Sequence, residues 1–159
     1  MARFFIGSAT HKLDGKGRVS LPSDFRDVLK EQAGASGGAE EFVLVPAQGD
    51  QAFHTGLSRS GHEALVRRIS GARYPNAAVK RAVRQRFIAA AKPISVEEGG
   101  RFVLPRELRE VLGLTNAVQF VGDGETFQIW QPERYAELAV EVPEAELDAV
   151  DLDFAGLVE

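Results

Sequence analysis

The amino-acid sequence predicts an α+β fold that is mostly β: a pseudo-twofold barrel made from two tandem copies of one small module. The first observation is an internal repeat, because residues 14–29 and 97–112 align at a constant offset of 83 without a gap and are identical at seven of 16 positions. The second is that each copy is followed by paired apolar runs typical of a β-hairpin. A unit of about 50 residues buries little surface alone, so we expect the two copies to interlock their strands around one core.

The two copies share residue types that are typical of tight turns, of helix starts and of the buried faces of helices. The identical pairs are Gly17/Gly100, Arg18/Arg101, Leu21/Leu104, Pro22/Pro105, Arg26/Arg109, Val28/Val111 and Leu29/Leu112, and the pairs acidic in both copies are Asp14/Glu97, Asp24/Glu107 and Asp27/Glu110. Gly17 and Gly100 can take the positive φ of a tight turn, which Asp14 or Glu97 opens. Each copy therefore predicts a strand, a turn and a second strand.

A short helix and a hairpin complete each copy. Pro22 and Pro105 end the second strand and suit the first turn of a helix. Apolar residues then recur at the i, i+3, i+4 spacing of one helix face, namely Phe25, Val28 and Leu29 in the first copy and Leu108, Val111 and Leu112 in the second. The predicted hairpin strands are Ala117–Val121 with Thr126–Trp130, joined through Asp123-Gly124, and Glu41–Pro46 with Gln51–Thr55.

The segment between the copies is predicted to be helical, from Ser60 to Lys92, and split by Gly71 and Tyr74-Pro75. Its second half, about Asn76 to Ala91, carries an apolar stripe of Val79, Val83 and Phe87. We expect that stripe to pack partly between subunits. A C-terminal helix is expected near Glu133–Val140, followed by an acidic, weakly ordered end.

These patterns divide the chain into four parts. They are a first module at 1–56, a helical linker at 57–92, a second module at 93–140 and an acidic tail at 141–159.

Composition excludes several classes of protein. The sequence has no run of about 18 apolar residues, so we expect no membrane span, and its first residues do not resemble a signal peptide. It has no cysteine, which excludes disulfides, thiolate zinc sites and a cysteine nucleophile. The three histidines, at 11, 54 and 62, lack metal-ligand spacing, and the adjacent Glu97 and Glu98 would diverge on a strand. We therefore expect no metal, no cofactor and no enzyme activity.

Charge is unevenly distributed along the chain. The net charge is −4, yet residues 1–30 carry +3 and residues 59–109 carry +8, whereas residues 132–159 carry −8. Local basic patches can attract phosphate despite a negative total. The charge pattern is therefore compatible with nucleic-acid binding by the repeated segments.

Arg18 and Arg101 are the leading candidates for contact with DNA. An arginine just after a glycine turn projects from a loop tip and can place its guanidinium on guanine O6 and N7. The alternative is that each arginine braces its turn by pairing with the carboxylate four residues earlier, Asp14 or Glu97, and both roles can coexist. Lys16 in the first turn and Lys12 on the preceding strand are candidate phosphate contacts.

Other basic residues favour structural interpretations. His11 is expected to brace the turn, and Arg26, Arg106 and Arg109 are expected to pair on the surface with Asp27, Glu107 or Glu110. The linker cluster of Lys80, Arg81, Arg84 and Arg86 is either a solvated helix face or a phosphate stripe, and it could pair with a neighbouring subunit's acidic tail.

The first copy resembles the opening module of the MraZ family of transcriptional regulators. The string GSATHKLDGKGRVSLP places Gly7, His11, Leu13, Asp14, Lys16, Gly17, Arg18 and Pro22 at that family's positions. The string EEGGRFVLP resembles the second module through Gly100, Arg101 and Pro105, with Glu97 where the family usually has Asp. The order of module, linker, module and acidic tail is also similar, so the resemblance covers nearly the whole chain.

The resemblance implies a swapped-hairpin barrel related to AbrB and a DNA-binding role for Arg18, with Arg101 following by the repeat. It also implies a ring-shaped homo-oligomer in the cytoplasm and nucleoid, without a small-molecule substrate. Its expected task is to regulate, as a repressor, the division and cell-wall gene cluster through G-rich direct repeats in its own promoter. Two alternatives stay open: an antitoxin-like AbrB relative, and a regulator that inhibits a nearby enzyme through its linker or tail.

Overall fold

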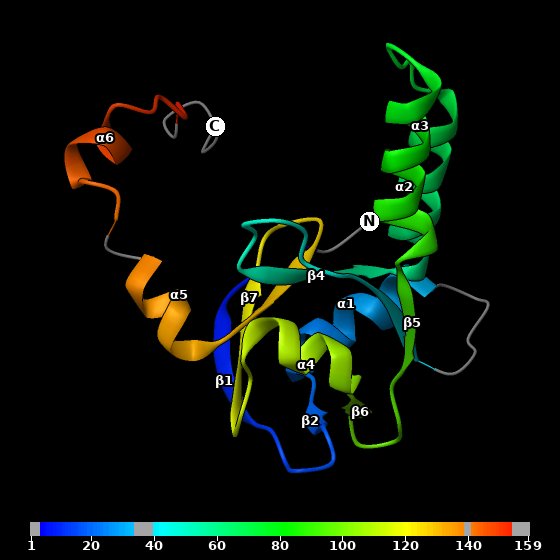
Figure 1. The fold of residues 1–159 in the computed structure, drawn as a ribbon. Coiled ribbons are helices and arrows are strands. Elements are labelled where there is room, and N and C mark those ends of the chain that lie inside the picture. Colours follow the sequence, from blue (N-terminus) through cyan, green and yellow to red (C-terminus); the bar gives the residue numbers. More distant parts are fainter. Residues whose placement is uncertain (1–3, 34–39, 139–140, 154–159) are drawn as a thin grey trace.

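The computed structural model describes residues 4–33, 40–138 and 141–153, which form a mixed α+β fold dominated by antiparallel strands (Figure 1). The strands are β1 (Ser8–Lys12), β2 (Arg18–Ser20), β3 (Glu41–Val45), β4 (Phe53–Ser58), β5 (Lys92–Ser95), β6 (Arg101–Val103), β7 (Ala117–Gly122) and β8 (Phe127–Trp130). The helices are α1 (Ser23–Ala33), α2 (Arg59–Gly71), α3 (Ala77–Arg84), the π-helix η2 (Gln85–Ala89), α4 (Arg106–Leu112), α5 (Pro132–Leu138) and α6 (Glu144–Asp148).

The sheet order joins the two repeats into one structure. Six strands pair in the order β1-β7-β8-β4-β3-β5, and β2 pairs with β6 in a separate two-stranded ribbon. Exchanging each strand for its repeat equivalent, β1 for β5, β3 for β7 and β4 for β8, reproduces the same order read backwards. The fold therefore has the predicted pseudo-twofold relation between strands, although these ladders alone do not join β1 to β5 into a closed barrel.

The first strand of each repeat pairs with the other repeat. β1 lies antiparallel to β7, with Ser8 opposite Val121 and Lys12 opposite Ala117. β5 lies antiparallel to β3 in the same way, with Ser95 opposite Glu41. Because each repeat completes the sheet of its partner, the core is shared, as the small size of each unit requires.

Phenylalanines fill the shared core. Phe127 on β8 lies with its ring centroid 5.2 Å from that of Phe25 on α1 and 5.3 Å from that of Phe42 on β3. Opposite it on β4 stands Gly56, where an added Cβ would lie 2.2 Å from the Phe127 ring. The glycine thus leaves the space that this ring occupies, and the aromatic side chain covers the bare backbone of β4.

Helices α2 and α3 form a hairpin that projects from the sheet (Figure 1). α2 ends at Gly71, and α3 begins after Asn76, whose side chain accepts a hydrogen bond from Val79 N, so the predicted break at residues 71–75 is confirmed. The second helix is not continuous to Ala91, as the sequence suggested. It widens at Gln85 into η2, where Ala90 N donates to Gln85 O over 2.9 Å.

Phe87 in η2 and Val79 in α3 have different surroundings. Phe87 lines a groove between the hairpin and the sheet, together with Leu57 and Leu65, whereas Val79 stays 39 % exposed on α3. The carbonyl oxygen of Phe87 lies 2.9 Å from Nε2 of His62 on α2. The stripe predicted from the sequence therefore spans two helix types, and Phe87, in the π-helix, lines the groove.

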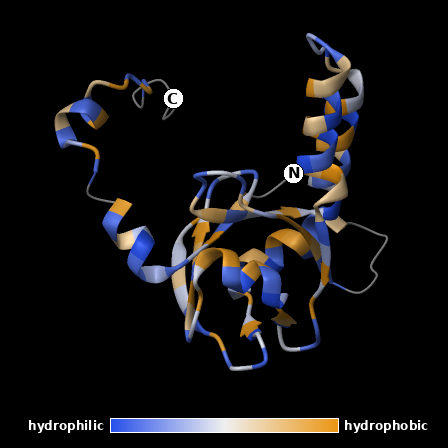
Figure 2. Cartoon of the chain, viewed as in Figure 1, coloured by the Kyte–Doolittle hydropathy of each residue, from blue (hydrophilic) through white to orange (hydrophobic). Residues whose placement is uncertain are grey.

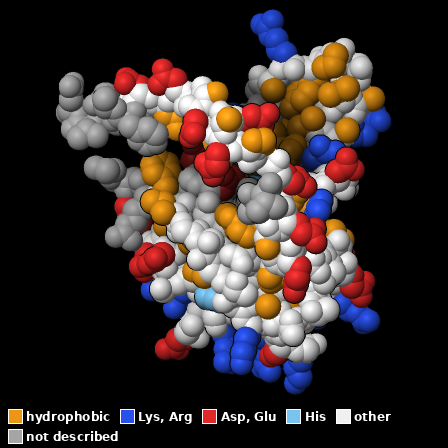
Figure 3. Space-filling view, turned by 90° about the vertical axis from the view of Figure 1, so that its left-hand side faces the viewer, with side chains coloured by type: hydrophobic (Ala, Val, Ile, Leu, Met, Phe, Trp, Pro, Cys, Tyr) orange, Lys and Arg blue, Asp and Glu red, His pale blue; other side chains and the backbone are white. Residues whose placement is uncertain are grey.

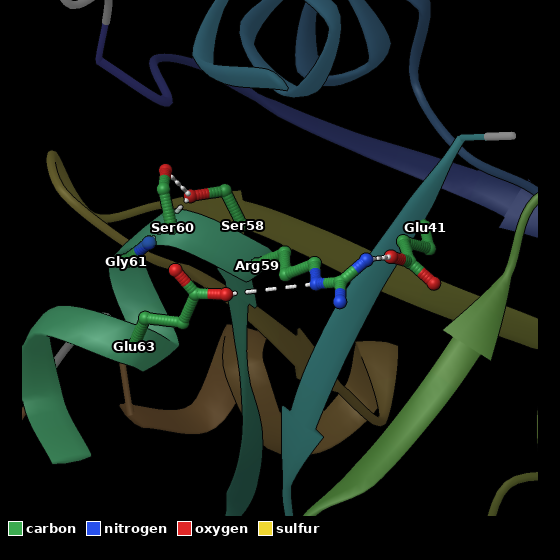
Figure 4. Close-up of polar contacts among 6 residues, drawn as sticks. All are labelled: Glu41, Ser58, Arg59, Ser60, Gly61 and Glu63. Carbon is green, nitrogen blue, oxygen red and sulfur yellow. Dashed lines mark hydrogen bonds and ion pairs between the residues drawn. The ribbon is translucent and has the colours of Figure 1, made fainter. Parts of the chain in front are cut away.

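Polar contacts anchor the hairpin to the sheet at its base (Figure 4). Ser58 caps α2 by accepting a hydrogen bond from Gly61 N over 3.0 Å. Arg59 donates to Glu41 on β3 over 2.8 Å and lies 3.6 Å from Glu63 one turn further along α2. These polar contacts lie at the base of the hairpin, and hydrophobic and hydrophilic residues are mixed along its projecting part (Figure 2).

The C-terminal helix α5 follows β8 directly, close to its predicted place. A further short helix, α6, lies in the acidic tail. The predicted limits of the second module and of the tail also include residues 139–140 and 154–159, which lie outside the described residues.

His54 links the two repeats through the core. Its ring is 0 % exposed, Nδ1 accepts a hydrogen bond from Ala47 N over 2.8 Å, and Nε2 lies 2.8 Å from the carbonyl oxygen of Leu108 on α4. An accepting Nδ1 leaves the proton on Nε2, so the buried ring is neutral. Burial lowers the pKa of His54, and the Leu108 carbonyl opposes this only in part.

The lowered pKa predicts acid sensitivity of the fold. Below about pH 6.5 the unfolded chain binds a proton at His54 that the folded chain does not, so stability is complete above that pH and falls as the pH falls. Each pH unit between the two pKa values should cost about 1.4 kcal/mol of unfolding free energy. Urea unfolding at pH 7.5 and 5.5 measures this cost, which should shrink in His54→Gln. A folded-state NMR titration of His54 at or above pH 6.5 would contradict it.

Candidate nucleic-acid interface

The β2–β6 ribbon carries both candidate arginines on its outer face. Val19 and Phe102, at the centre of each strand, are buried in the core. Because side chains alternate along a strand, their neighbours point outward. In the antiparallel register Arg18 lies opposite Val103, and Arg101 lies opposite Ser20. Two arginines that are 83 residues apart in sequence therefore share one exposed surface.

The first turn holds Arg18 through Asp14. One carboxylate oxygen of Asp14 accepts hydrogen bonds from Lys16 N over 2.9 Å and from Arg18 N over 2.8 Å, and the other accepts from Arg18 Nε over 2.9 Å. The backbone N–H of Arg18, followed by its guanidinium, lowers the pKa of Asp14. Among the described residues no group accepts a hydrogen bond from Nη1 or Nη2 of Arg18, so these two guanidinium nitrogens stay available to a ligand.

The second turn has the same backbone but a different side-chain arrangement. Glu97 N donates to Arg101 O over 2.8 Å, and Gly100 N donates to Glu97 O over 2.9 Å, as the equivalent atoms do in the first turn. Within the described part of the chain, however, neither the Glu97 carboxylate nor the Arg101 guanidinium forms an ion pair or a hydrogen bond. Arg101 is therefore exposed without the brace that orients Arg18.

The two turns support each other through crossed contacts. Leu21 N donates to Gly100 O, and Leu104 N donates to Gly17 O, both over 2.8 Å. Gly17 has a φ of +85° and Gly100 a φ of +88°, and each lies against an arginine of the opposite repeat. A Cβ on Gly17 would approach Arg109 Nε to 2.9 Å, and one on Gly100 would approach Arg26 Cδ to 2.8 Å. Glycine is thus required both by backbone conformation and by space.

These contacts correct the partners predicted for Arg26 and Arg109. Arg26 pairs with Glu40 over 3.2 Å instead of Asp27, and Arg109 donates from Nε to the carbonyl oxygen of Leu104 over 3.0 Å. Helix spacing suggested neighbours on the same helix, but the interlocked repeats bring other acceptors closer.

Two further ion pairs complete the surroundings of the turns. Arg106 pairs with Glu110 over 3.0 Å, and this prediction is confirmed. Lys30 joins Arg26 at Glu40, over 3.4 Å. Burial opposes ionisation of Glu40, but the hydrogen bonds and charges of Arg26 and Lys30 outweigh burial and lower the pKa of Glu40.

A groove of about 630 Å³ brings several of the sequence-predicted residues together. It runs between β1 and β2 and includes Lys12, Asp14, Arg18 and Arg101 in its lining. His11 lies in the same lining; its Nδ1 contacts the carbonyl oxygen of Ser20, and its ring packs edge-on against Phe120. Of these residues, His11 has the bracing position expected for it.

Lysine and arginine side chains gather around this end of the molecule. Figure 3 shows them at the lower end, where the turns after β1 and β5 lie in Figure 1. Lys16 is exposed in the first turn but does not line the groove. Gly99, with a φ of +92°, holds the equivalent place in the second turn, so the two turns present unequal charge.

Two outer-face residues of the ribbon were missed by the sequence analysis. Ser20 and Val103 occupy equivalent positions, each two residues after the arginine of its repeat. The repeat alignment contained the necessary signal, since a strand places residues two apart on one face.

Neither a metal-binding cluster nor a membrane-spanning helix is found among the described residues. Across the three described ranges no group of three or more His, Asp or Glu side chains is placed to hold a metal ion. None of the helices seen in these ranges is both long and apolar enough to cross a membrane.

Comparison with known proteins identifies the class. The chain is 36 % identical over 157 residues to a transcriptional regulator MraZ of Ruegeria pomeroyi, covering 97 % of this chain and 93 % of that one. It is 37 % identical over 153 residues to one of Cereibacter sphaeroides, covering 89 % and 88 %. It is 32 % identical over 155 residues to one of an Anaeromyxobacter species, covering 97 % and 99 %. These relatives define a class of transcriptional regulators, not of enzymes.

The family model agrees with these relatives. It is described as "MraZ protein, putative antitoxin-like", and it matches residues 4–50 and 87–154, one segment for each repeat. The chain belongs to the MraZ family of transcriptional regulators.

Proposed function

We propose that this chain is a sequence-specific DNA-binding regulator that places the β2–β6 ribbon and its two flanking turns on double-stranded DNA. The observation that carries the proposal is the meeting of Arg18 and Arg101 on one exposed ribbon face, beside a groove that Lys12 also lines. A two-stranded β-ribbon fits the major groove, where an arginine fork can bond guanine O6 and N7.

The Asp14 contact favours base reading by Arg18. Only Nε of Arg18 is bonded to the carboxylate, so the two terminal nitrogens can reach a base while Asp14 holds the side chain in place. Lys12 and Lys16 are well placed for phosphate contacts, which position a protein without reading sequence. Acidic residues away from this end would repel DNA and so favour this one orientation.

The finer biological role follows from the family resemblance. The proposed targets are G-rich direct repeats in the chain's own promoter, and the proposed effect is repression of the division and cell-wall gene cluster, in the cytoplasm at the nucleoid. For the fold, we propose that the curved six-stranded sheet and the β2–β6 ribbon together form the pseudo-twofold, AbrB-like barrel. The limits 1–56, 57–92, 93–140 and 141–159 remain our proposed division of the chain.

We propose a ring-shaped homo-oligomer built through the helical hairpin. Val79 is exposed on α3, and apolar side chains gather over the upper part of the molecule, where the hairpin projects (Figure 3). Residues 59–89 carry eight Lys or Arg and one Glu, whereas residues 132–159 carry nine acids and one Arg. This charge complementarity favours a second copy of the chain as the partner that packs against the helical hairpin. Several subunits on several repeats would gain avidity without new contacts.

Arg18→Ala tests base reading. It should weaken binding to the DNA upstream of the chain's own gene by about 5- to 150-fold for each guanine that is no longer read, because a bidentate bond to guanine contributes about 1–3 kcal/mol. Arg101→Ala should act in the same direction. Arg106→Ala is the matched control, since Arg106 pairs with Glu110 on α4 and does not line the groove. Gel-shift titrations measure the affinities, and wild-type affinity in Arg18→Ala would refute the assignment.

Lys16→Ala tests phosphate contact. The plot of log K against log salt should become shallower by about 0.9 for each phosphate that the variant no longer neutralises, whereas base preference should stay unchanged. Lys30→Ala removes the same charge from α1, where Lys30 pairs with Glu40, and should leave the slope as in wild type. An unaltered slope in Lys16→Ala would remove this residue from the interface.

Val79→Asp tests assembly. A charge in a buried apolar contact is costly, so the variant should scatter light as a smaller species and lose affinity for an array of repeats more than for a single repeat. Ala77→Asp is the control, since it lies about 200° away around the same helix. Circular dichroism should show both variants folded. Unchanged mass and array affinity in Val79→Asp would exclude this face from the interface.

A further inference from the structure

The outer face of the ribbon is not symmetric, although its backbone is. Val103 is 47 % exposed and lies directly opposite Arg18. Ser20, its repeat equivalent, lies directly opposite Arg101. Each arginine therefore has a different neighbour: a branched apolar side chain beside Arg18, and a small hydroxyl beside Arg101.

The ladder places these neighbours close together. The bonds Leu21 N to Gly100 O and Leu104 N to Gly17 O make the pairs at 21/100 and 17/104 hydrogen-bonded ones. Since the two types of pair alternate, Arg18/Val103 and Ser20/Arg101 are non-hydrogen-bonded pairs, whose Cβ atoms lie about 4.5–5.5 Å apart. Successive base pairs are about 3.4 Å apart along DNA. Directly opposite residues can therefore reach the same or neighbouring base pairs.

An exposed valine on a DNA-facing surface has one specific partner in the major groove. The C5-methyl group of thymine is the apolar feature that bases present there, whereas a serine hydroxyl can bond to either donors or acceptors. Val103 does not contribute to the core, because its neighbour Phe102 points inward and is buried.

We infer that Val103 is a specificity-determining residue that contacts the methyl group of a thymine beside the guanine read by Arg18. The inference rests on the proposed function. The two halves of the ribbon then read different sequences. Arg18, with Val103 beside it, reads a guanine next to a thymine, whereas Arg101, with Ser20 beside it, reads a guanine without requiring a neighbouring methyl group. A pseudo-twofold ribbon thereby recognises a site that is not a palindrome.

Removing single methyl groups from DNA tests this. The probes are duplexes selected by the wild-type chain from a random library, in which each thymine is replaced in turn by deoxyuridine, which lacks only the methyl group. Wild type should lose about four-fold in affinity at one such position, the effect of one buried methyl group. Val103→Ser should lose that sensitivity to uridine, whereas Val103→Thr, which keeps one methyl group, should retain part of it. Ser20→Val should favour a second thymine in the other half of the site.

The outcomes separate this inference from the proposed function. If wild type selects a sequence that depends on Arg18 but shows no uridine-sensitive position, or if Val103→Ser keeps the wild-type sensitivity, the role of Val103 is refuted while base reading by Arg18 stands. If wild type selects no sequence, or Arg18→Ala binds the selected duplexes equally well, the proposed function itself fails. Because Val103 is exposed, Val103→Ser should fold as wild type, which circular dichroism checks.

Discussion

The crossed backbone bonds between the two Gly-Arg turns are the constraint on which the rest of the structure depends. Leu21 binds the carbonyl of Gly100, and Leu104 binds that of Gly17, so neither turn can be placed without the other. The arginine of the opposite helix occupies the space above each glycine. Through these contacts the β2–β6 ribbon is held in one register, and that register brings Arg18 and Arg101 to the same face.

The sequence predicted the elements well because their signals are local. The turn glycines and the prolines before α1 and α4 lie within a few residues of the structures they specify. The apolar face predicted for α1 is buried, whereas Val111, on the face predicted for α4, is 61 % exposed. The repeat supplied the pseudo-twofold relation. The partners of Arg26 and Arg109 could not be predicted, because they are set by long-range interlocking and not by helix spacing. The π-helix at Gln85 also left no clear local signal in the sequence, which predicted a single helix continuous to Ala91.

The sequence predicted which residues belong to the candidate site, but not how they are arranged in space. Arg18 and Arg101 stood out because they follow the repeated glycine, but only the strand register shows that they share a face with Ser20 and Val103. The two turns have also diverged: Asp14 holds Arg18, whereas Glu97 forms no such bond to Arg101 in the part of the chain that the structure describes. Arg18 is therefore preorganised, and Arg101 must lose more side-chain entropy on binding.

The exchange of first strands also constrains how the protein can form during synthesis. β1 leaves the ribosome well before its partner β7, which begins more than 100 residues later at Ala117. The edge of β1 must therefore stay unpaired until the roughly 100 residues between Lys12 and Ala117 have been translated. Pairing between such distant segments is slow, and unpaired edges promote aggregation. Two nascent chains on one messenger RNA could pair β1 of one chain with β7 of the other. Tandem repeats that exchange their first strands are therefore prone to domain swapping between neighbouring copies of the chain.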